Sequence, residues 1–411
     1  MSALRQKIEQ EIRERGPIPL SRYMELCLYD GELGYYSRNA AQFGKAGDFY
    51  TSSDVHAVFG RLLARQFEEM WRVLGSPEHI TLRELGPGRG LFAQDVLDWS
   101  EKKFPDFFRA LRYVLDERSC ALRQRMETTL ARHFESGKSI LDFGVGFLAL
   151  ETAGETPRET IGKGTTSVVP YRASDEWALA PDVPLILFAN EFFDALPVEV
   201  VSSQGSLRID ARNGRLIETW ASPSREELEF LDRYSIHPEA SERVEVPLEA
   251  QAHLSAATKF DRGFVVVIDY GYTREEQLAG RHRGTLKAIR QHSVSANPYE
   301  APGEQDITAD VNFTALAAVA EKQGMQTQKL ITQSQFLLGI GEANEFADAF
   351  EECRLPQERA KVALQLKHLV TPAGMGESFH VLAASKGIEK EKVEMLAGLN
   401  FGTKKLRANA D

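Results

Sequence analysis

The sequence predicts an α/β protein built on a mostly parallel sheet that is covered on both faces. Short apolar runs alternate with helical stretches between residues 80 and 272, which is the pattern of buried parallel strands. The turn ELGPGRG at 84–90, with three glycines, directly follows the first run, and acidic residues end later runs. Because the carboxyl ends of parallel strands meet at one edge of the sheet, we expect the functional site there.

Each element follows from its local pattern. Helical periodicity covers Leu4 to Arg15, GPIP interrupts it, and a second helix follows near 21–29. The next loop, 30–53, is rich in glycine and tyrosine, and a loop of this length in a compact protein is usually functional. A helix is expected at about 55–74. The strands ITLREL, RYVLDE, PLILFAN and GFVVVIDYGY follow, with helices at about 91–103 and from Cys120.

The pattern of the sequence changes after Pro197 from apolar runs separated by helices to short strands separated by turns. Turn signals at Gln204-Gly205 and Asn213-Gly214 predict two or three antiparallel strands. This segment is interpreted as an insertion beside the sheet. After Gly387 the chain is strongly charged, which is typical of a surface helix or loose tail. The expected organisation is a helical N-terminal region with a covering loop at 1–77, core segments at 78–199 and 263–386, the β-rich insertion at 200–262 and the tail at 387–411.

Composition limits the possible partners. The 411 residues carry a formal net charge of -11, which opposes unaided binding to nucleic acid. The three cysteines lie far apart without metal-ligand spacing, so no metal site is expected. Apolar stretches fall far short of the roughly 20 residues that cross a bilayer, so no membrane insertion is expected. The first residues lack the pattern of a secretory or transit peptide, which favours the cytoplasm.

The glycine turn admits two classes of ligand. Dinucleotide sites need GxGxxG, but Gly86, Gly88 and Gly90 are followed by Leu91, so that spacing fails. S-adenosylmethionine has no phosphate and carries an ammonium group, which the carboxylate of Glu84 could attract. One strand later, Asp116 or Glu117 could accept both ribose hydroxyls, and we prefer Glu117. A competing turn, SILDFGVG at 139–146, lacks a following strand to carry the ribose ligand.

The stretch NEFFDALPV at 190–198 predicts the acceptor side of the site. An apolar strand delivers Asn190 and Glu191 to the sheet edge, and Asp194 follows among aromatic residues. Asp194 could instead cap a short helix. Paired carboxylates match the planar donors of a guanidinium, which stays protonated at neutral pH. Methyl transfer to its nitrogen would depend mostly on alignment, with a carboxylate relaying a proton.

The motifs GDFYTSSDVHAVFGR, ELGPGRG, NEFFDALPV, IDYGY, GTLKAIRQH, DITADVNFTAL and MGESFHVLAAS occur in this order over roughly residues 5–386. This combination resembles the MidA-like family of S-adenosylmethionine-dependent methyltransferases. Mitochondrial members of that family are protein arginine methyltransferases that assist assembly of respiratory complex I. The resemblance implies a class I methyltransferase fold with a seven-stranded, Rossmann-like sheet, and symmetric dimethylation of a protein arginine.

The resemblance also implies roles for individual residues. It supports Glu84, Gly86, Gly88 and Gly90 as the cofactor turn and Glu117 as the ribose ligand, and it favours ELGPGRG over SILDFGVG. Asn190, which its strand delivers to the same edge, is a further candidate cofactor ligand. Asp48 and Thr51 match a segment that would fold over the cofactor. Glu191, Asp194 and His292 are the candidate catalytic residues, while Asp269 and Tyr270 end another strand at the same edge.

Two departures from the family pattern limit this inference. Asp310 and Asn312 stand where family members tend to have a histidine and an aspartate, so no role of that histidine is carried over to this chain. Residues 137–180 match poorly, and no adenine ligand is assigned. Three alternatives remain: a non-catalytic assembly factor that binds the cofactor, a methyltransferase acting on a small molecule or RNA, and, disfavoured by the failed glycine spacing, a nicotinamide dehydrogenase.

Overall fold

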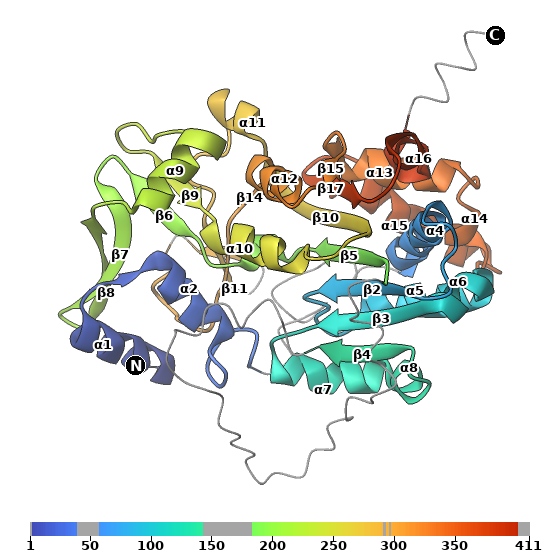
Figure 1. The fold of residues 1–411 in the computed structure, drawn as a ribbon. Helices are drawn as coiled ribbons and strands as arrows, with labels where there is room; N and C mark the ends of the chain where they lie inside the picture. Colours follow the sequence, from blue (N-terminus) through green and yellow to red (C-terminus); the bar gives the residue numbers. More distant parts are fainter. Residues whose placement is uncertain (1, 39–56, 143–182, 291–292, 296, 402–411) are drawn as a thin grey trace.

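The computed structural model describes residues 2–38, 57–142, 183–290, 293–295 and 297–401. Within this part of the chain the main sheet has nine strands, with the order β15-β17-β10-β5-β2-β3-β4 and with β14 and β16 at its margins (Figure 1). The strands are β2 (Ile80–Leu85), β3 (Leu111–Asp116), β4 (Ser139–Asp142), β5 (Leu185–Asn190), β10 (Gly263–Tyr272), β14 (Val311–Asn312), β15 (Gln326–Thr327), β16 (Ile331–Thr332) and β17 (Phe379–Lys386). The five strands from β4 to β10 are parallel, and β17 is antiparallel to β10. This arrangement confirms the predicted Rossmann-like fold.

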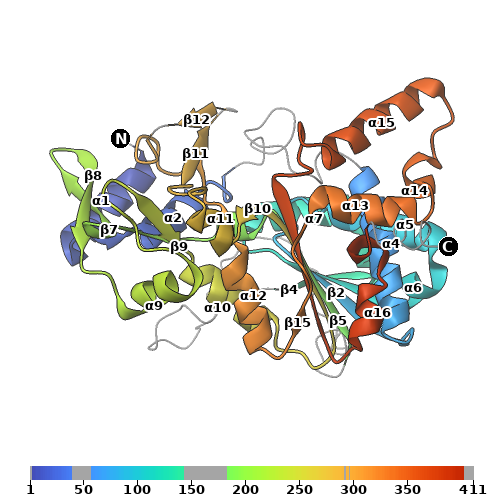
Figure 2. The same ribbon diagram turned by 90° about the horizontal axis from the view of Figure 1, so that it is seen from above.

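Helices cover both faces of the sheet because side chains alternate along its strands. Phe188 and Val266 belong to a core with α4 (Ala57–Val73), α5 (Leu91–Lys103) and α13 (Gln333–Glu342). Leu187 and Val265 belong to a second core with α10 (Leu248–Ala257) and α12 (Phe313–Lys322). The two helical layers flank the sheet in Figure 2.

The sheet has a switch point beside β2. The chain runs outward from β2 through β3 to β4 on one side, and from β5 to β10 on the other. In register, Leu85 lies between Asp116 of β3 and Ala189 of β5. The residues that follow these three positions therefore emerge side by side, at the place where parallel α/β sheets bind ligands.

A second, antiparallel sheet contains β1 (Ile18–Pro19), β6 (Glu199–Ser202), β7 (Gly205–Arg212), β8 (Arg215–Ala221) and β9 (Arg243–Val246). The expected turn forms at Asn213 and Gly214, with φ of 52° and 69°. One feature differs from the sequence-based division: β1 pairs with β7, and α1 (Ala3–Arg15) and α2 (Leu20–Tyr29) share its apolar core. The N-terminal helices and the insertion thus pack together at one end of the molecule (Figure 1).

The remaining elements surround these two sheets. They are α6 (Pro105–Ala110), α7 (Cys120–Thr129), α8 (Ala131–Glu135), α9 (Arg225–Tyr234), α11 (Arg274–Leu278), α14 (Ala347–Phe350) and α15 (Pro356–Val370), the 3-10 turn η3 (Phe193–Ala195), and a small sheet of β11 (Lys287–Arg290), β12 (Ser293–Ser295) and β13 (Asp306–Thr308). None of the helices in the described ranges combines the length and apolar character needed to cross a bilayer.

The charged C-terminal segment is more ordered than a loose tail as far as residue 401. It forms α16 (Lys390–Glu394) and η4 (Ala397–Leu399), and it buries Val393 and Leu396 in the core that includes α4. Gln66 and Glu69 of α4 accept the backbone N–H groups of Gly398 and Ala397 at 2.8 and 2.9 Å. The charges alone could not indicate these contacts.

Candidate active site

The glycine turn after β2 depends on backbone conformations that favour glycine. Gly86, Gly88 and Gly90 have φ of 63°, 57° and 76°. The N–H of Gly86 donates to the carbonyl of Asp116 at 3.0 Å, which ties the turn to β3. A Cβ on Gly86 would lie 2.6 Å from Cδ2 of Phe192. The missing side chain therefore allows the turn and the NEFFDALPV segment to approach closely.

Gly90 differs from Gly86 and Gly88 in its surroundings. It is the N-cap of α5, and it is not one of the residues that line the pocket. A Cβ on Gly90 would lie 3.0 Å from atoms of both Leu130 and Met126. A side chain at Gly90 would therefore disturb the packing of α5 against Leu130 and α7, and a role of Gly90 at the cofactor stays a prediction.

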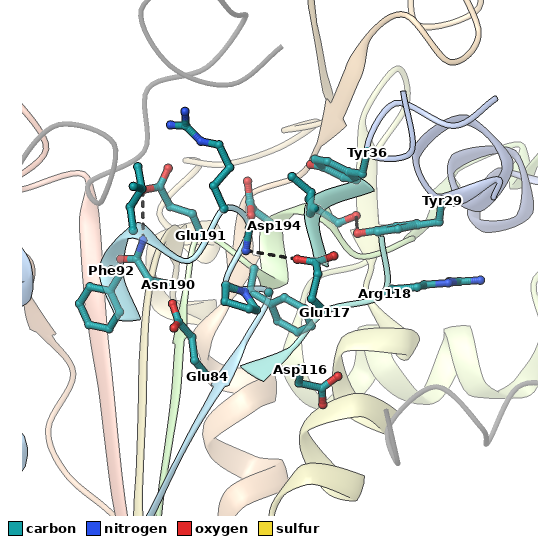
Figure 3. A pocket seen from close by; sticks show the side chains of 18 of the residues that line it. Tyr29, Tyr36, Glu84, Phe92, Asp116, Glu117, Arg118, Asn190, Glu191 and Asp194 are labelled. Carbon is teal, nitrogen blue, oxygen red and sulfur yellow. Dashed lines mark hydrogen bonds between the residues drawn. The ribbon is translucent and has the colours of Figure 1, made fainter. Parts of the chain in front are cut away.

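A pocket opens at the predicted sheet edge. It is lined by residues that follow β2, β3 and β5, together with residues of the N-terminal region. Figure 3 shows how acidic and aromatic side chains surround it. Its lining includes the predicted residues Glu84, Gly86, Gly88, Glu117, Asn190, Glu191 and Asp194. The structure therefore brings together most of the site that the motifs indicated.

Glu84 is a buried carboxyl group on β2. The hydroxyl of Tyr113 donates to its Oε2 at 2.7 Å. Burial nevertheless raises the pKa of Glu84 to about 8, and the charge of Glu117 acts in the same direction. A cationic ligand group in the pocket would favour the ionised form and lower this pKa.

The two acids after β3 have separate environments. The carboxylate of Asp116 pairs with Arg83 at 2.7 Å, so the charge of Asp116 is already compensated. Arg83 also contacts Asp142 at 2.8 Å. Glu117 accepts the N–H groups of Ser119 at 2.8 Å and Gly88 at 3.2 Å. Burial raises the pKa of Glu117 to about 7. These contacts fix Glu117 beside the glycine turn and favour it over Asp116 as a ligand for ribose hydroxyls.

The NEFFDALPV segment, which forms the turn after β5, contains a strained residue. Glu191 has φ of 50°, a conformation that non-glycine residues rarely adopt. Its N–H donates to the carbonyl of Ile268 at 3.0 Å, and its Oε1 accepts the Asn190 amide at 3.3 Å. Strain of this kind is found disproportionately at functional sites.

Asp269 of β10 holds the rest of this turn in place. Its Oδ2 accepts the N–H groups of Phe192, Phe193 and Asp194 at 3.2, 3.1 and 3.3 Å, and its Oδ1 accepts that of Tyr270 at 3.0 Å. Burial and the charge of Asp194 raise the pKa of Asp269 well above its ordinary value. Asp269 is thus a scaffold residue of the turn.

Asp194 is more buried than a simple capping residue on the surface would be. Its side chain is only 3% exposed, and the hydroxyl of Tyr270 donates to its Oδ2. Burial raises the pKa of Asp194 to about 6, although the Tyr270 hydrogen bond opposes this. Its other oxygen, Oδ1, has no hydrogen-bond partner among the described residues.

Three predicted site residues and two departures from the family pattern remain to be considered. Asp48, Thr51 and His292 are outside the described residues. Of the two family departures, Asn312 caps α12 by accepting the N–H of Ala315 at 2.9 Å. Asp310 contacts His282 and Lys287, both at 2.9 Å. Neither Asn312 nor Asp310 lines the pocket.

Sequence reasoning missed the tyrosines and one acid of this pocket. Tyr29, Tyr35 and Tyr36 come from the N-terminal region, and Asp306 comes from β13. The hydroxyl of Tyr36 donates to Oδ1 of Asp306 at 2.8 Å. The tyrosine-rich loop was a usable signal that the loop was functional. Nothing local in the sequence indicated that Asp306 would meet it.

The profile of a family of S-adenosyl-L-methionine-dependent methyltransferases matches residues 62–331, which is well over half of the chain. The chain belongs to this family. The glycine turn and the buried acids of the pocket fit that cofactor, and the protein is an S-adenosylmethionine-dependent methyltransferase.

Relatives of this methyltransferase match over most of its length. A protein from Drosophila melanogaster named protein arginine methyltransferase NDUFAF7 homolog, mitochondrial, is 28% identical and covers 94% of this chain and 85% of its own. The mitochondrial protein arginine methyltransferase NDUFAF7 of Homo sapiens is 27% identical, with 91% and 81% covered. A crystal structure of a candidate methyl transferase from Burkholderia thailandensis, bound to S-adenosyl-homocysteine, is 25% identical with a TM-score of 0.76, covering 96% of this chain and 94% of that one.

The names of the relatives overturn the cytoplasmic localisation expected for this methyltransferase. That expectation rested on the absence of a recognisable leader pattern in the first residues. The matching relatives from Drosophila melanogaster, Danio rerio and Homo sapiens are all named as mitochondrial proteins. A missing leader pattern is weak information on where a protein works, because targeting depends on a short segment that is independent of the fold.

Proposed function

We propose that this methyltransferase transfers methyl groups to an arginine side chain of a protein substrate. The observation that carries the proposal is the shape of the pocket, in which the glycine turn opens into a compartment lined by acids and tyrosines. The relatives are named protein arginine methyltransferases. The net charge of -11 also suits a cationic substrate better than RNA.

On this proposal the cofactor side is formed by Glu84, Gly86, Gly88, Glu117 and Asn190. The ionised carboxyl group of Glu84 attracts the ammonium group, and Glu117 accepts hydrogen bonds from the ribose hydroxyls. The glycine turn lets the backbone approach the ligand without a Cβ in the way. When bound, S-adenosylmethionine supplies a methyl group made electrophilic by its sulfonium.

The acceptor side is formed by Glu191 and Asp194 from the turn after β5. A guanidinium is a weak nucleophile because its nitrogen lone pairs are delocalised, and it stays protonated at neutral pH. Carboxylates aligned with its N–H groups orient one nitrogen and can accept the proton that the methylated product releases. By family resemblance His292 is proposed to line this side, and Asp48 and Thr51 to cover the cofactor.

The test is transfer of label from S-adenosylmethionine. Purified protein is incubated with the methyl-labelled cofactor and a cell extract, and labelled proteins are hydrolysed and analysed for methylarginines. We expect label in methylarginine. Cofactor binding without any labelled protein would favour a non-catalytic assembly factor, and label in RNA or small molecules alone would assign another acceptor. Comparing arginine methylation by mass spectrometry in cells with and without the protein would identify its client, for which the family resemblance suggests a complex I subunit.

Cofactor binding should depend on pH. Burial raises the pKa of Glu84 to about 8 and that of Glu117 to about 7, so both are partly protonated near neutral pH without ligand. The ligand requires the ionised forms, and affinity should therefore rise between pH 6 and pH 8, by at most about tenfold per pH unit for each proton released. The stability of the unliganded protein should change with pH in the opposite direction. Because folding raises the pKa of both carboxyl groups, their contribution to stability is present below pH 4.5 and is lost as the pH rises through 7 to 8.

Calorimetric titration with S-adenosylhomocysteine at several pH values measures this dependence. Glu117→Gln is the matched control, because it removes one of the two titrating groups and should make the profile shallower. A flat profile for the unmodified protein would show that these carboxyl groups do not ionise on binding.

A further inference from the structure

The pocket has a compartment in which residues from the N-terminal region meet two acids that are far apart in the sequence. In Figure 3, Tyr29 and Tyr36 lie on one side of Asp194, and Glu84 lies on the other. Their ring centroids are 5.4 Å apart with the planes tilted by 38°. Asp306 lines the same pocket. We call the space between Tyr29, Tyr36, Asp194 and Asp306 the tyrosine recess.

The backbone ties the two acids of the tyrosine recess together. The N–H of Ala309, just after β13, donates to the carbonyl of Asp194 at 2.9 Å. Burial raises the pKa of the Tyr29 and Tyr36 hydroxyls well above its ordinary value, and the charges of Asp306 and Asp194 contribute to this in both cases. Both carboxylates therefore act on the same small space.

The two carboxylate oxygens of Asp194 differ in their side-chain pairing. The Tyr270 hydroxyl occupies its Oδ2, whereas Oδ1 is buried without a hydrogen-bond partner among the described residues. A buried carboxylate oxygen without a donor is unfavourable, and such groups usually gain their partner from a ligand or a water molecule. Asp306 is only 4% exposed, and the Tyr36 hydroxyl on its Oδ1 holds it in orientation.

The two tyrosines supply walls rather than further donors to the space. The hydroxyl of Tyr29 donates to the carbonyl of Ala195 at 2.9 Å, and that of Tyr36 is engaged with Asp306. Aromatic faces attract cations and stack on the flat guanidinium group. Two carboxylates and two rings together match a planar cation with several donors better than a compact ammonium.

We infer that Asp306 acts with Asp194 to recognise the guanidinium of the acceptor arginine in the tyrosine recess, and that Asp306 determines specificity for arginine over lysine. This inference rests on the proposed function. It separates two tasks: Asp194 and Asp306 bind the acceptor from two different elements, while Glu191, which accepts the Asn190 amide, lies between the acceptor and the cofactor ligands. The aspartate of β13 becomes a substrate-binding residue that the motif around Asn190 does not contain.

Asp306→Asn tests the charge of this residue without removing its shape. The amide oxygen can still accept the Tyr36 hydroxyl, so the recess should keep its structure. Calorimetry or NMR titration with N-acetylarginine methylamide, in the presence of S-adenosylhomocysteine, measures acceptor binding. We expect binding of this probe to weaken roughly 10- to 100-fold, with S-adenosylhomocysteine affinity changed less than about twofold. N-acetyllysine methylamide should bind at least about tenfold more weakly than the arginine probe to the unmodified protein.

Glu304→Gln is the matched control, because Glu304 lies two positions before Asp306 and pairs with Arg290 at 2.7 Å outside the recess. It should leave both affinities unchanged. Asp194→Asn should weaken the arginine probe in the same direction, and the double variant should show less than the sum of the two effects, as coupled residues do.

The outcomes distinguish this inference from the proposed function. If Asp306→Asn binds the arginine probe as the unmodified protein does, or if arginine and lysine probes bind equally, the tyrosine recess is not the guanidinium site. The proposed function could still hold, because the labelling of arginine in cell extract is measured separately. If that labelling fails for the unmodified protein, the proposed function and this inference fall together.

Discussion

Replacing Glu191 by glutamine is expected to reduce methyl transfer by at least ~100-fold, while the affinity for S-adenosylmethionine changes little. Glu191 follows β5 with φ of 50°, and its N–H is held by the carbonyl of Ile268. Glutamine has the same shape and can still accept the Asn190 amide through its side-chain oxygen. The substitution therefore removes the negative charge that would orient the acceptor and accept its proton, and little else.

Single-turnover transfer of labelled methyl groups and calorimetry with S-adenosylhomocysteine measure the two effects separately. The variant also separates an enzyme from an assembly factor, since a non-catalytic role should survive Glu191→Gln. Glu191→Asp keeps the negative charge on a side chain that is shorter by one methylene. Its rate of methyl transfer should therefore lie between those of the unmodified protein and Glu191→Gln. Transfer at the normal rate by the glutamine variant would show that Glu191 has no part in the reaction.

Replacing Gly86 by valine is expected to weaken cofactor binding by about 100-fold or more. Gly86 has φ of 63°, where a side chain is disfavoured by about 1–2 kcal/mol and a β-branched one by more. Its Cβ would also lie 2.6 Å from Cδ2 of Phe192. Either the glycine turn or the Phe192 ring must move, and both line the pocket.

Gly280→Val is the matched control for backbone strain. Gly280 has φ of 88°, and a Cβ there would meet no atom within 4 Å. Gly280→Val should lower the thermal unfolding temperature through strain, yet bind S-adenosylhomocysteine normally. If Gly86→Val binds the cofactor as tightly as Gly280→Val, the glycine turn is not part of the cofactor site.

Much of the fold was predictable because the signals are local. A continuous apolar run such as GFVVVIDYGY can hardly be anything but a buried strand in a chain of this size, and β10 covers those residues. The spacing of Gly86 and Gly88 after such a run likewise indicated where the chain must turn. The cofactor class followed from that spacing and from the acids beside it, and the family match agrees.

The candidate site was predicted less completely, for two physical reasons. First, Gly90 looks the same in sequence as its neighbours, yet it also packs against Leu130 and Met126, which the local pattern does not show. Second, Tyr270 was expected only at the same sheet edge as Asp194, and Asp306 was not expected there at all, because both come from strands that follow much later in the chain. The predicted cytoplasmic localisation was also wrong, because the residues that form the core of a fold do not depend on the cellular compartment in which the protein works.

The amino-acid sequence by itself determined the layered α/β architecture, the position of the ligand-binding edge and the cofactor, because apolar periodicity and glycine spacing act over a few residues. Only the tertiary structure decided which distant side chains share one pocket. Tyr36 and Asp306 are 270 positions apart, and the hydrogen bond between them exists only because the N-terminal helices pack on the inserted sheet beside β13. Contacts of this kind depend on how complete elements pack against one another, and no short stretch of sequence contains that information.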